Sequence, residues 1–205
     1  MDFDGSFIGR GIVDVTTLEA AVNRLTAEDW TADRSRQSKF AVHSQTQTIP
    51  LCFDRDFRHM DATICDEWRV FAPGMHPLLQ HCTNIFNGGY LVRALLTRLP
   101  SGGRIPPHVD WGFSLSHSHR LHVPICTNDH VVFRVGQDLQ VMGKGQVWEI
   151  NNMRRHTVMN NGTTHRIHLI VDWAWHMSKA ELDEYRLDRA RMATLTASGH
   201  EQKYD

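Results

Sequence analysis

Residues 120–150 read RLHVPICTNDHVVFRVGQDLQVMGKGQVWEI, and this stretch decides the fold. Short runs rich in valine, isoleucine and aromatic residues alternate here with the turn segments Gly136-Gln-Asp138 and Gly143-Lys-Gly145. Branched and aromatic side chains favour strands, and glycine-containing turns join antiparallel neighbours. Short strands separated so closely by turns are typical of a sandwich or barrel and not of an alternating βαβ sheet.

The strand pattern extends on both sides of this stretch. Residues 89–99 are compatible with helix or strand by periodicity alone, and their context favours a strand. A further strand is expected between Phe40 and Phe53, where threonine, valine and isoleucine partly alternate. The other predicted strands are residues 120–126, 130–135, 139–142, 146–150 and 166–173.

Helices are expected near both ends of the chain. Thr16-Thr-Leu-Glu19 has the pattern of a capping box, and Leu18, Val22 and Leu25 recur at helical spacing, which predicts a helix over residues 16–25. A short helix is expected from Pro73 to Cys82. Another should begin at Ser178 and run to about Met192.

Composition excludes several classes of protein. The chain has 205 residues, enough for one domain with a real core, and a formal net charge of −1, so neither nucleic acid nor a membrane surface is an expected partner. Its four cysteines form no C-x-x-C pair, and no apolar run approaches the roughly 20 residues that cross a bilayer. The start of the chain lacks a signal-peptide pattern. We therefore expect a cytoplasmic protein.

One set of residues points to metal chemistry. His108-Val-Asp110, His156 and Arg166 occur in this order. Two imidazoles and one carboxylate on one side of a metal form the facial triad of non-haem Fe(II) oxygenases. Residues i and i+2 of an extended segment face the same way, so His108 and Asp110 suit a strand end. Arg166 could hold a carboxylate of an organic co-substrate.

Each member of this set also has an ordinary structural interpretation. The chain has 14 histidines, so a single one is more often a surface or core residue than a ligand. Arg166 could be a surface strand residue and Thr97 an ordinary strand threonine. Asp172 is interpreted as structural. His117, His119, His165 and His168 are interpreted as surface residues or as residues that at most orient ligands.

The ordered set resembles the aspartyl/asparaginyl β-hydroxylases, which are Fe(II)- and 2-oxoglutarate-dependent oxygenases. The similarity covers about residues 85–176. Its matching pieces are Pro107-His108, the R-x-H of Arg120 and His122, the interval from His156 to Arg166, and Arg166-Ile-His-Leu-Ile-Val-Asp-Trp173. Thr97 stands where the family tends to have a small hydroxyl residue.

The resemblance implies a role for each matching residue. His108, Asp110 and His156 would bind Fe(II). Arg166 and Thr97 would hold the C5 carboxylate of 2-oxoglutarate, the co-substrate that is consumed with O₂, and Arg120 and His122 would lie near its C1 carboxylate. The animal peptide hydroxylases of the family have glycine at the position of Asp110. Halogenases also lack this carboxylate, so Asp110 argues against halogenation.

For the whole chain we predict one mainly β domain over residues 1–205. It is expected to be a double-stranded β-helix (jelly roll, cupin-like) with a core at about residues 85–176 and flanking N- and C-terminal α-helices. The expected reaction is hydroxylation of a C–H bond of a free amino acid or small carboxylate-bearing metabolite, giving succinate and CO₂. Substrate contacts are predicted, with less support from the pattern, at Arg155, His43 and Gln45.

Three alternatives remain open at this point. The first is β-hydroxylation of Asp or Asn within a peptide or protein. The others come from different classes: a cupin-like metal hydrolase or isomerase, and a ligand-binding jelly roll without metal chemistry. A carboxylate clamp at Arg166 separates the oxygenase from the hydrolase, and bound metal separates it from the simple binder. The sequence does not predict the oligomeric state.

Overall fold

We describe the fold from a computed structural model of the chain, which describes residues 3–53, 63–175 and 187. Residues 1–175 form one compact unit and residues 176–205 a second. The predicted C-terminal helix over residues 178–192 lies outside the described residues, apart from Leu187. The prediction of a single domain over residues 1–205 stays a prediction.

Ten strands make up most of the compact unit. The strands are β1 Phe7–Ile12, β2 Gln47–Cys52, β3 Tyr90–Leu99, β4 Arg104–His108, β5 Ser118–Cys126, β6 Val131–Val135, β7 Asp138–Gln140, β8 Gln146–Ile150, β9 His156–Asn160 and β10 Arg166–Ala174. The helices are α1 Thr16–Val22, α2 Ala27–Thr31, α3 Ser35–Lys39, the 3₁₀ turn η1 Ala41–His43, α4 Trp68–Ile85 and α5 Phe113–Ser116.

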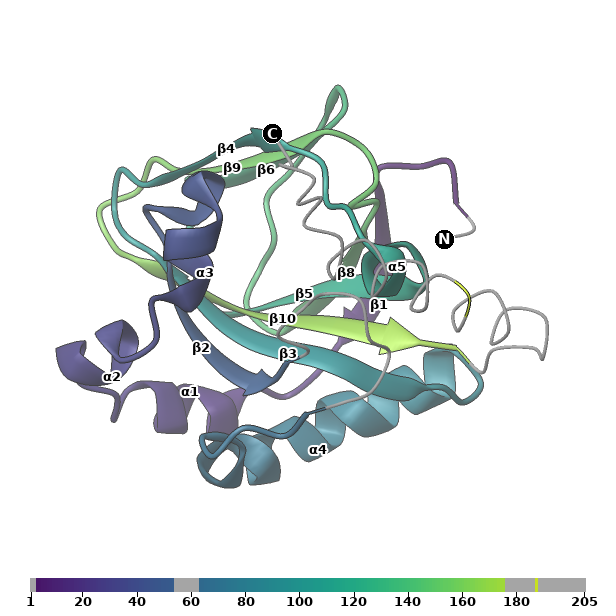
Figure 1. Ribbon diagram of the computed structural model, residues 1–205, viewed down its shortest axis with the longest axis horizontal. Helices are drawn as coiled ribbons and strands as arrows, with labels where there is room; N and C mark the ends of the chain where they lie inside the picture. The colour runs from purple at the N-terminus through teal and green to yellow at the C-terminus, as the bar shows by residue number, and fades with distance from the viewer. Residues whose placement is uncertain (1–2, 54–62, 176–186, 188–205) are drawn as a thin grey trace. The chain divides into compact units, whose positions relative to one another are not determined.

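The strands form two antiparallel sheets. One sheet has the order β1-β8-β5-β10-β3-β2, and the other has the order β4-β9-β6-β7. Figure 1 shows β4, β9 and β6 facing β5, β10 and β3, with α4 along the opposite side of the larger sheet. The prediction of a mainly β fold is confirmed.

The larger sheet has two different faces because side chains alternate along its strands. On β10, Ile167, Leu169 and Val171 belong to an apolar cluster with Leu18 of α1 and with α4. The alternate residues Arg166, His168, Ile170 and Asp172 are also buried and lie on the other face, toward the smaller sheet. A fully buried strand face is normally apolar, so this row of polar side chains marks a site.

The two predicted helices that lie within the described residues are present, but their ends differ from the prediction. Helix α1 ends at Val22, and its first residue makes no capping box: the Thr16 hydroxyl donates to Asp14 Oδ1 at 2.6 Å. The capping box is on α2 instead, formed by Thr26 and Asp29. Helix α4 is longer than predicted because its buried positions, such as Phe71, Met75, Leu78 and Cys82, keep helical spacing beyond both prolines.

Strand predictions failed mainly where the chain turns close to the site. Residues 40–46 are not a strand: η1 occupies residues 41–43, and β2 begins only at Gln47. Strand β9, which contains His156, was not predicted as a strand. Strand β7 ends at Gln140, two residues earlier than expected. The predicted strands at residues 89–99, 120–126, 146–150 and 166–173 are confirmed within two residues at each end.

Cys82 and Cys126 are free thiols. Among the described segments, none of the helices combines the length and the apolar character needed to span a bilayer.

Candidate metal centre

Two histidines meet across the smaller sheet. Strands β4 and β9 are antiparallel, and His108 at the end of β4 is the direct partner of His156 at the start of β9. Their ring centroids are 4.2 Å apart. Directly opposed residues of an antiparallel pair have close side chains, so strand register alone brings these two imidazoles together although 47 positions separate them in the sequence.

Both imidazole rings are held in one tautomer. His108 Nδ1 lies 2.9 Å from the carbonyl oxygen of Pro106, and His156 Nδ1 lies 2.9 Å from that of Arg154. A carbonyl oxygen only accepts, so each Nδ1 carries the hydrogen and donates it. The lone pair of each ring is then on Nε2. This is how metal-binding histidines are usually oriented, with the second ring nitrogen bound to a neighbouring acceptor.

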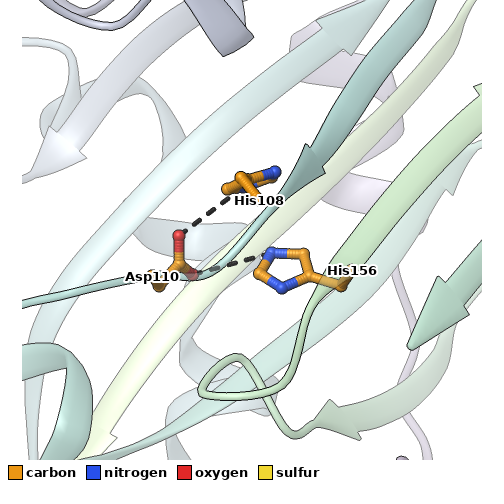
Figure 2. A group of neighbouring side chains, drawn as sticks. All are labelled: His108, Asp110 and His156. Atoms are coloured by element: carbon orange, nitrogen blue, oxygen red, sulfur yellow. Dashed lines mark ion pairs between the residues drawn. The ribbon is translucent and has the colours of Figure 1, made fainter. Parts of the chain in front are cut away.

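Asp110 completes the cluster from the loop after β4. Its Oδ1 is 3.6 Å from His108 Nε2, and its Oδ2 is 3.8 Å from His156 Nε2, as Figure 2 shows. The backbone N–H of Asp110 donates to the carbonyl of Asn152, which fixes the loop. One ligand atom from each of the three residues lies within 4.8 Å of the others, so one ion can contact all three.

A buried ion-pair network holds the Asp110 carboxylate. Arg120 Nη1 donates to Asp110 Oδ2, while Arg120 Nε and Nη2 donate to the two oxygens of Asp172 at 2.8 Å each. Arg93 binds the same Asp172 carboxylate from β3 and donates to Ser114 Oγ. Arg93, Asp172 and Arg120 are register partners on β3, β10 and β5, so the network runs straight across the sheet.

This network keeps Asp110 ionised. Burial alone would raise the pKa of Asp110, but the Arg120 guanidinium, helped by His156 and His108, holds it well below its usual range. The pKa of Asp172 is lowered in the same way, chiefly by Arg120 and Arg93 against the effect of burial. Burial, and next His156, lowers the pKa of His108, so its ring is neutral and able to bind a metal near pH 7.

A second group of polar side chains lies on the same sheet face. Arg166 and Thr97 are buried, and Thr97 is the register partner of His168. The guanidinium of Arg166 lies over the ring of Phe133 from β6. The same ring stacks on His168 at 5.3 Å between centroids, and His122 meets it edge-on at 5.1 Å.

Many polar atoms of this second group have no partner. The unpaired atoms are Arg166 Nε and Nη2, Thr97 Oγ1, His122 Nδ1 and both ring nitrogens of His168. The only hydrogen bond that Arg166 makes through its side chain, among the described residues, is a long one of 3.5 Å to the Thr97 carbonyl. Unpaired buried polar groups are costly, so this concentration of them indicates a place for a polar ligand.

Burial also decides the charges in this group. It lowers the pKa of Arg166 to about 9, which leaves the guanidinium charged at neutral pH. Burial, and next the charge of Arg166, holds the pKa values of His122 and His168 well below the usual range. The group therefore presents one cation surrounded by neutral polar rings, a suitable environment for a carboxylate.

The three predicted substrate residues differ in burial and in the contacts they make. His43 is buried, and its ring lies edge-on to that of His108 at 5.5 Å. Gln45 is used within the protein, because its Oε1 accepts from the backbone N–H of Arg104 at 2.8 Å. The side chain of Arg155 is exposed. The interpretation of residues 43–49 as an alternating strand face was wrong, since η1 replaces its first part.

Three buried or partly buried residues near the site were not singled out. His168 is fully buried, which rules out the surface interpretation and leaves its other interpretation, as a residue that at most orients ligands. Its position two residues after Arg166 on a strand was the signal that places it on the same face. Arg93 could have been found by the same alternation on β3. Arg36 lies on the short helix α3, which no pattern in the sequence predicts.

Comparison with known proteins fits this geometry. The family model described as aspartyl/asparaginyl beta-hydroxylase matches residues 67–176, just over half of the 205 residues. The chain belongs to this family. The match includes His108, Asp110, His156 and Arg166 and leaves out α3 and β2. No curated protein sequence matches the chain.

Solved structures show the same fold in distant proteins. An oxidoreductase of the 2OG-Fe(II) oxygenase family from Burkholderia pseudomallei has a TM-score of 0.54 and 16% sequence identity, over 79% of this chain and 78% of that chain. AviO1 from Streptomyces viridochromogenes Tue57 has a TM-score of 0.53 and 13% identity, over 84% of this chain and 91% of that chain. These likenesses establish the fold.

Proposed function

We propose that the protein is an Fe(II)- and 2-oxoglutarate-dependent hydroxylase built on a double-stranded β-helix. It would hydroxylate a C–H bond of a free amino acid or a small carboxylate-bearing metabolite. Family membership supports the class of reaction. The single observation that carries the proposal is the buried guanidinium of Arg166, which has two unpaired donors and lies on the sheet face that also carries the network around Asp110.

The donor set suits ferrous iron. His108, Asp110 and His156 offer two neutral imidazole nitrogens and one carboxylate oxygen, the set typical of Fe(II) centres that keep positions open for co-substrate and O₂. With its charge partly balanced by Arg120, Asp110 would bring a carboxylate that is already oriented toward both rings. We assign all three residues as iron ligands.

The open edge of Arg166 suits the C5 carboxylate of 2-oxoglutarate. Nε and Nη2 of Arg120 bind the two oxygens of Asp172, and the same pair of donors on Arg166 is unpaired. Two parallel N–H groups match the two oxygens of a carboxylate. Thr97 and His168 provide further unpaired groups beside it, and His122 on the neighbouring strand β5 would lie near the C1 end.

Bound Fe(II), 2-oxoglutarate and O₂ supply an oxidation in which the 2-oxo acid becomes succinate and CO₂ and a substrate C–H becomes C–OH. The residues of this chain bind and orient the reactants for that step. Arg166 would fix one end of the co-substrate, and the buried rings of His122, His168 and Phe133 would exclude water from around it.

The decisive experiment measures succinate released from 2-oxoglutarate with Fe(II), screened over free amino acids, small carboxylates and short Asp- or Asn-containing peptides. We expect a free amino acid or small carboxylate to stimulate release; stimulation only by peptides would favour the peptide hydroxylase. Arg166→Ala should abolish release and weaken 2-oxoglutarate binding at least about 30-fold, the loss typical of a removed buried charge partner.

Arg134→Ala is the matched control, because Arg134 is an exposed arginine on β6. It should behave like the wild type. A wild type that binds metal and releases no succinate would instead favour a metal hydrolase or isomerase, which needs no carboxylate clamp. Full succinate release in Arg166→Ala would overturn the assignment of Arg166 as the clamp. Failure of the wild type to bind a divalent metal would favour a ligand-binding protein.

A further inference from the structure

A second arginine near the metal centre lacks an anionic partner. Arg36 lies on α3, and its Nη2 is 3.0 Å from His43 Nε2. Its Nε and Nη1 are buried and have no hydrogen-bond partner, and it forms no ion pair among the described residues. Burying guanidinium N–H groups without hydrogen-bond partners costs free energy, so these two groups indicate a binding site for a ligand that would accept from them.

His43 adds a further donor next to Arg36. Guanidinium nitrogens only donate, so His43 Nε2 accepts from Arg36 and its hydrogen is on Nδ1. That Nδ1 is buried and also lacks a partner. The pair presents only hydrogen-bond donors, the complement of an anion.

The position of Arg36 places the Arg36–His43 pair near the candidate metal centre. Arg36 lines a small cavity with Asp33, Thr48, Pro50, Phe53 and Leu95, and Leu95 is two residues before Thr97 on β3. The Asp33 carboxylate already accepts from the backbone N–H of Ser35 at 2.8 Å. Gln37 ties α3 to β2 by donating to the Thr46 carbonyl at 3.0 Å. The His43 ring is edge-on to His108. A ligand at Arg36 would thus lie between the metal centre and the face that carries Thr97.

The charges around Arg36 agree with this placement. Burial lowers its pKa to about 10, and the charges of Arg120, Asp110, Arg93 and Asp172 all act on it. Both carboxylates in that set already bind Arg120, and Asp172 also binds Arg93. Within the part of the chain that the structure describes, Arg36 therefore stays charged and forms no ion pair, with Asp33 of the same cavity included.

We propose that Arg36 and His43 form the binding site for a carboxylate of the substrate, separate from the Arg166 site for the co-substrate. The inference rests on the proposed function, since it assigns the second anion to the molecule that is oxidised. It replaces the exposed Arg155 as the cation that recognises an acidic substrate. Free amino acids and small organic acids carry the required group.

The test is calorimetric titration of the full chain, loaded with Mn(II) and free of oxygen so that no turnover occurs. The probes are L-aspartate, L-asparagine and the α-amide of L-aspartate, each titrated with and without saturating 2-oxoglutarate. We expect the wild type to bind aspartate at least about tenfold more tightly than one of the two amides. The amide that loses affinity identifies the carboxylate that Arg36 binds.

Arg36→Met should bind aspartate at least about tenfold more weakly and distinguish the amides less than about twofold, with unchanged affinity for 2-oxoglutarate. Arg34→Met, an exposed arginine beside the same helix, is the control and should match the wild type. Because Arg36→Met removes an unpaired buried charge, its metal-free form should melt no lower than the wild type. If Arg36 served only the structure, its replacement would lower the melting temperature of the metal-free protein.

Three outcomes would overturn the proposal: unchanged aspartate binding in Arg36→Met, a loss confined to 2-oxoglutarate, or no probe bound by the wild type. The proposed function fails separately. If the wild type binds aspartate through Arg36 and does not bind 2-oxoglutarate, the carboxylate site stands and the oxygenase assignment falls.

Discussion

At the scale of single residues, the imidazoles of His108 and His156 are oriented by the backbone. Each Nδ1 donates to the carbonyl two residues earlier in the chain, in Pro106 and Arg154. No side-chain partner is needed, so the local extended backbone that carries each histidine also fixes its tautomer. The resulting site has both Nε2 atoms directed at Asp110 before a metal binds.

Replacing either histidine should therefore abolish metal binding. In His156→Ala, the remaining imidazole and carboxylate give only two ligands, and we expect bound Fe(II) or Mn(II) to fall from one per chain to near zero after anaerobic dialysis. His165→Ala, which changes an exposed histidine on the loop before β10, should keep one metal per chain. Stoichiometric metal in His156→Ala would contradict the assignment.

The His168 side chain should lower the stability of the metal-free protein and strengthen the binding of 2-oxoglutarate. Both of its ring nitrogens are buried without partners, so His168→Leu should stabilise the metal-free protein by about 1–2 kcal/mol in urea denaturation. The same change removes a polar group beside Arg166, and 2-oxoglutarate should bind about tenfold more weakly. A less stable variant with unchanged affinity would mean that the ring serves packing alone.

Spacing and resemblance named His108, Asp110, His156, Arg166 and Thr97 as site residues, and their roles stay predictions. The structure places His108 and His156 on the smaller sheet, Asp110 in the loop after β4, and Arg166 and Thr97 on the larger sheet. Residue-scale prediction failed for Arg36, because α3 is a five-residue helix whose position depends on tertiary contacts. The hydrogen bonds that orient it, such as that from Gln37 to Thr46, leave no periodic pattern in a sequence.

At the scale of elements, Asn160 joins the end of β9 to the turns beside it. Its Nδ2 donates to the carbonyls of Leu99, Pro100 and Thr164, and its Oδ1 accepts from the N–H of Gly162. One side chain thus connects three chain segments around the strand that begins with His156. The sequence pattern showed only Asn-Asn-Gly, which predicts a turn and does not distinguish the two asparagines.

Asn160→Ala should lower the free energy of unfolding by about 2–4 kcal/mol, because several buried carbonyls and an N–H lose their partner. Asn161→Ala alters the exposed neighbour and should change it by less than about 0.5 kcal/mol. Urea denaturation of the metal-free proteins measures both. Equal effects of the two substitutions would show that the side-chain bonds of Asn160 contribute little.

Element boundaries were harder to predict than element types. The strand assignment of residues 89–99 and 166–173 was right because long apolar runs suit a sheet that is covered on both faces. The strand predicted between Phe40 and Phe53 is confirmed as β2 over Gln47–Cys52, but its predicted start was wrong, because residues 40–46 carry strand-forming residues while they turn between α3 and β2. There the tertiary position overrides local preference.

At the scale of the whole molecule, the buried neutral histidines make stability depend on pH. The pKa values of His43, His122 and His168 are well below 6.5, with burial as the largest cause. Below pH 6.5 these rings take up protons in the unfolded chain and stay neutral in the folded one. The free energy of unfolding should therefore fall as pH decreases from 6.5, by about 1.4 kcal/mol per pH unit for each ring, and be nearly constant above it.

Urea denaturation of the metal-free protein at pH 7.5, 6.5 and 5.5 measures this dependence. In His168→Leu, the slope of the free energy of unfolding against pH below 6.5 should decrease by the contribution of one ring. In His165→Ala, this slope should stay nearly as large as in the wild type. An identical slope in His168→Leu and in the wild type would show that His168 takes up its proton equally in both states.

The global architecture was partly predictable for a simple reason. Turns and apolar runs after residue 102 are local, and they gave most of the strands and the mainly β class. Which strands become neighbours depends on long-range pairing, such as β1 beside β8 and β4 beside β9. That pairing decides how the sheets face each other, and no local pattern records it.

The contact between Arg120 and Asp110 has a consequence for charge balance at the centre. Replacing Asp110 by glycine would leave the buried guanidinium of Arg120 directed at the proposed metal position, with the Asp110 carboxylate no longer between them. Two like charges at such close range attract a diffusible anion. A chloride or formate ion entering from solvent would then occupy the vacated position, and the single substitution would make the proposed metal site sensitive to halide.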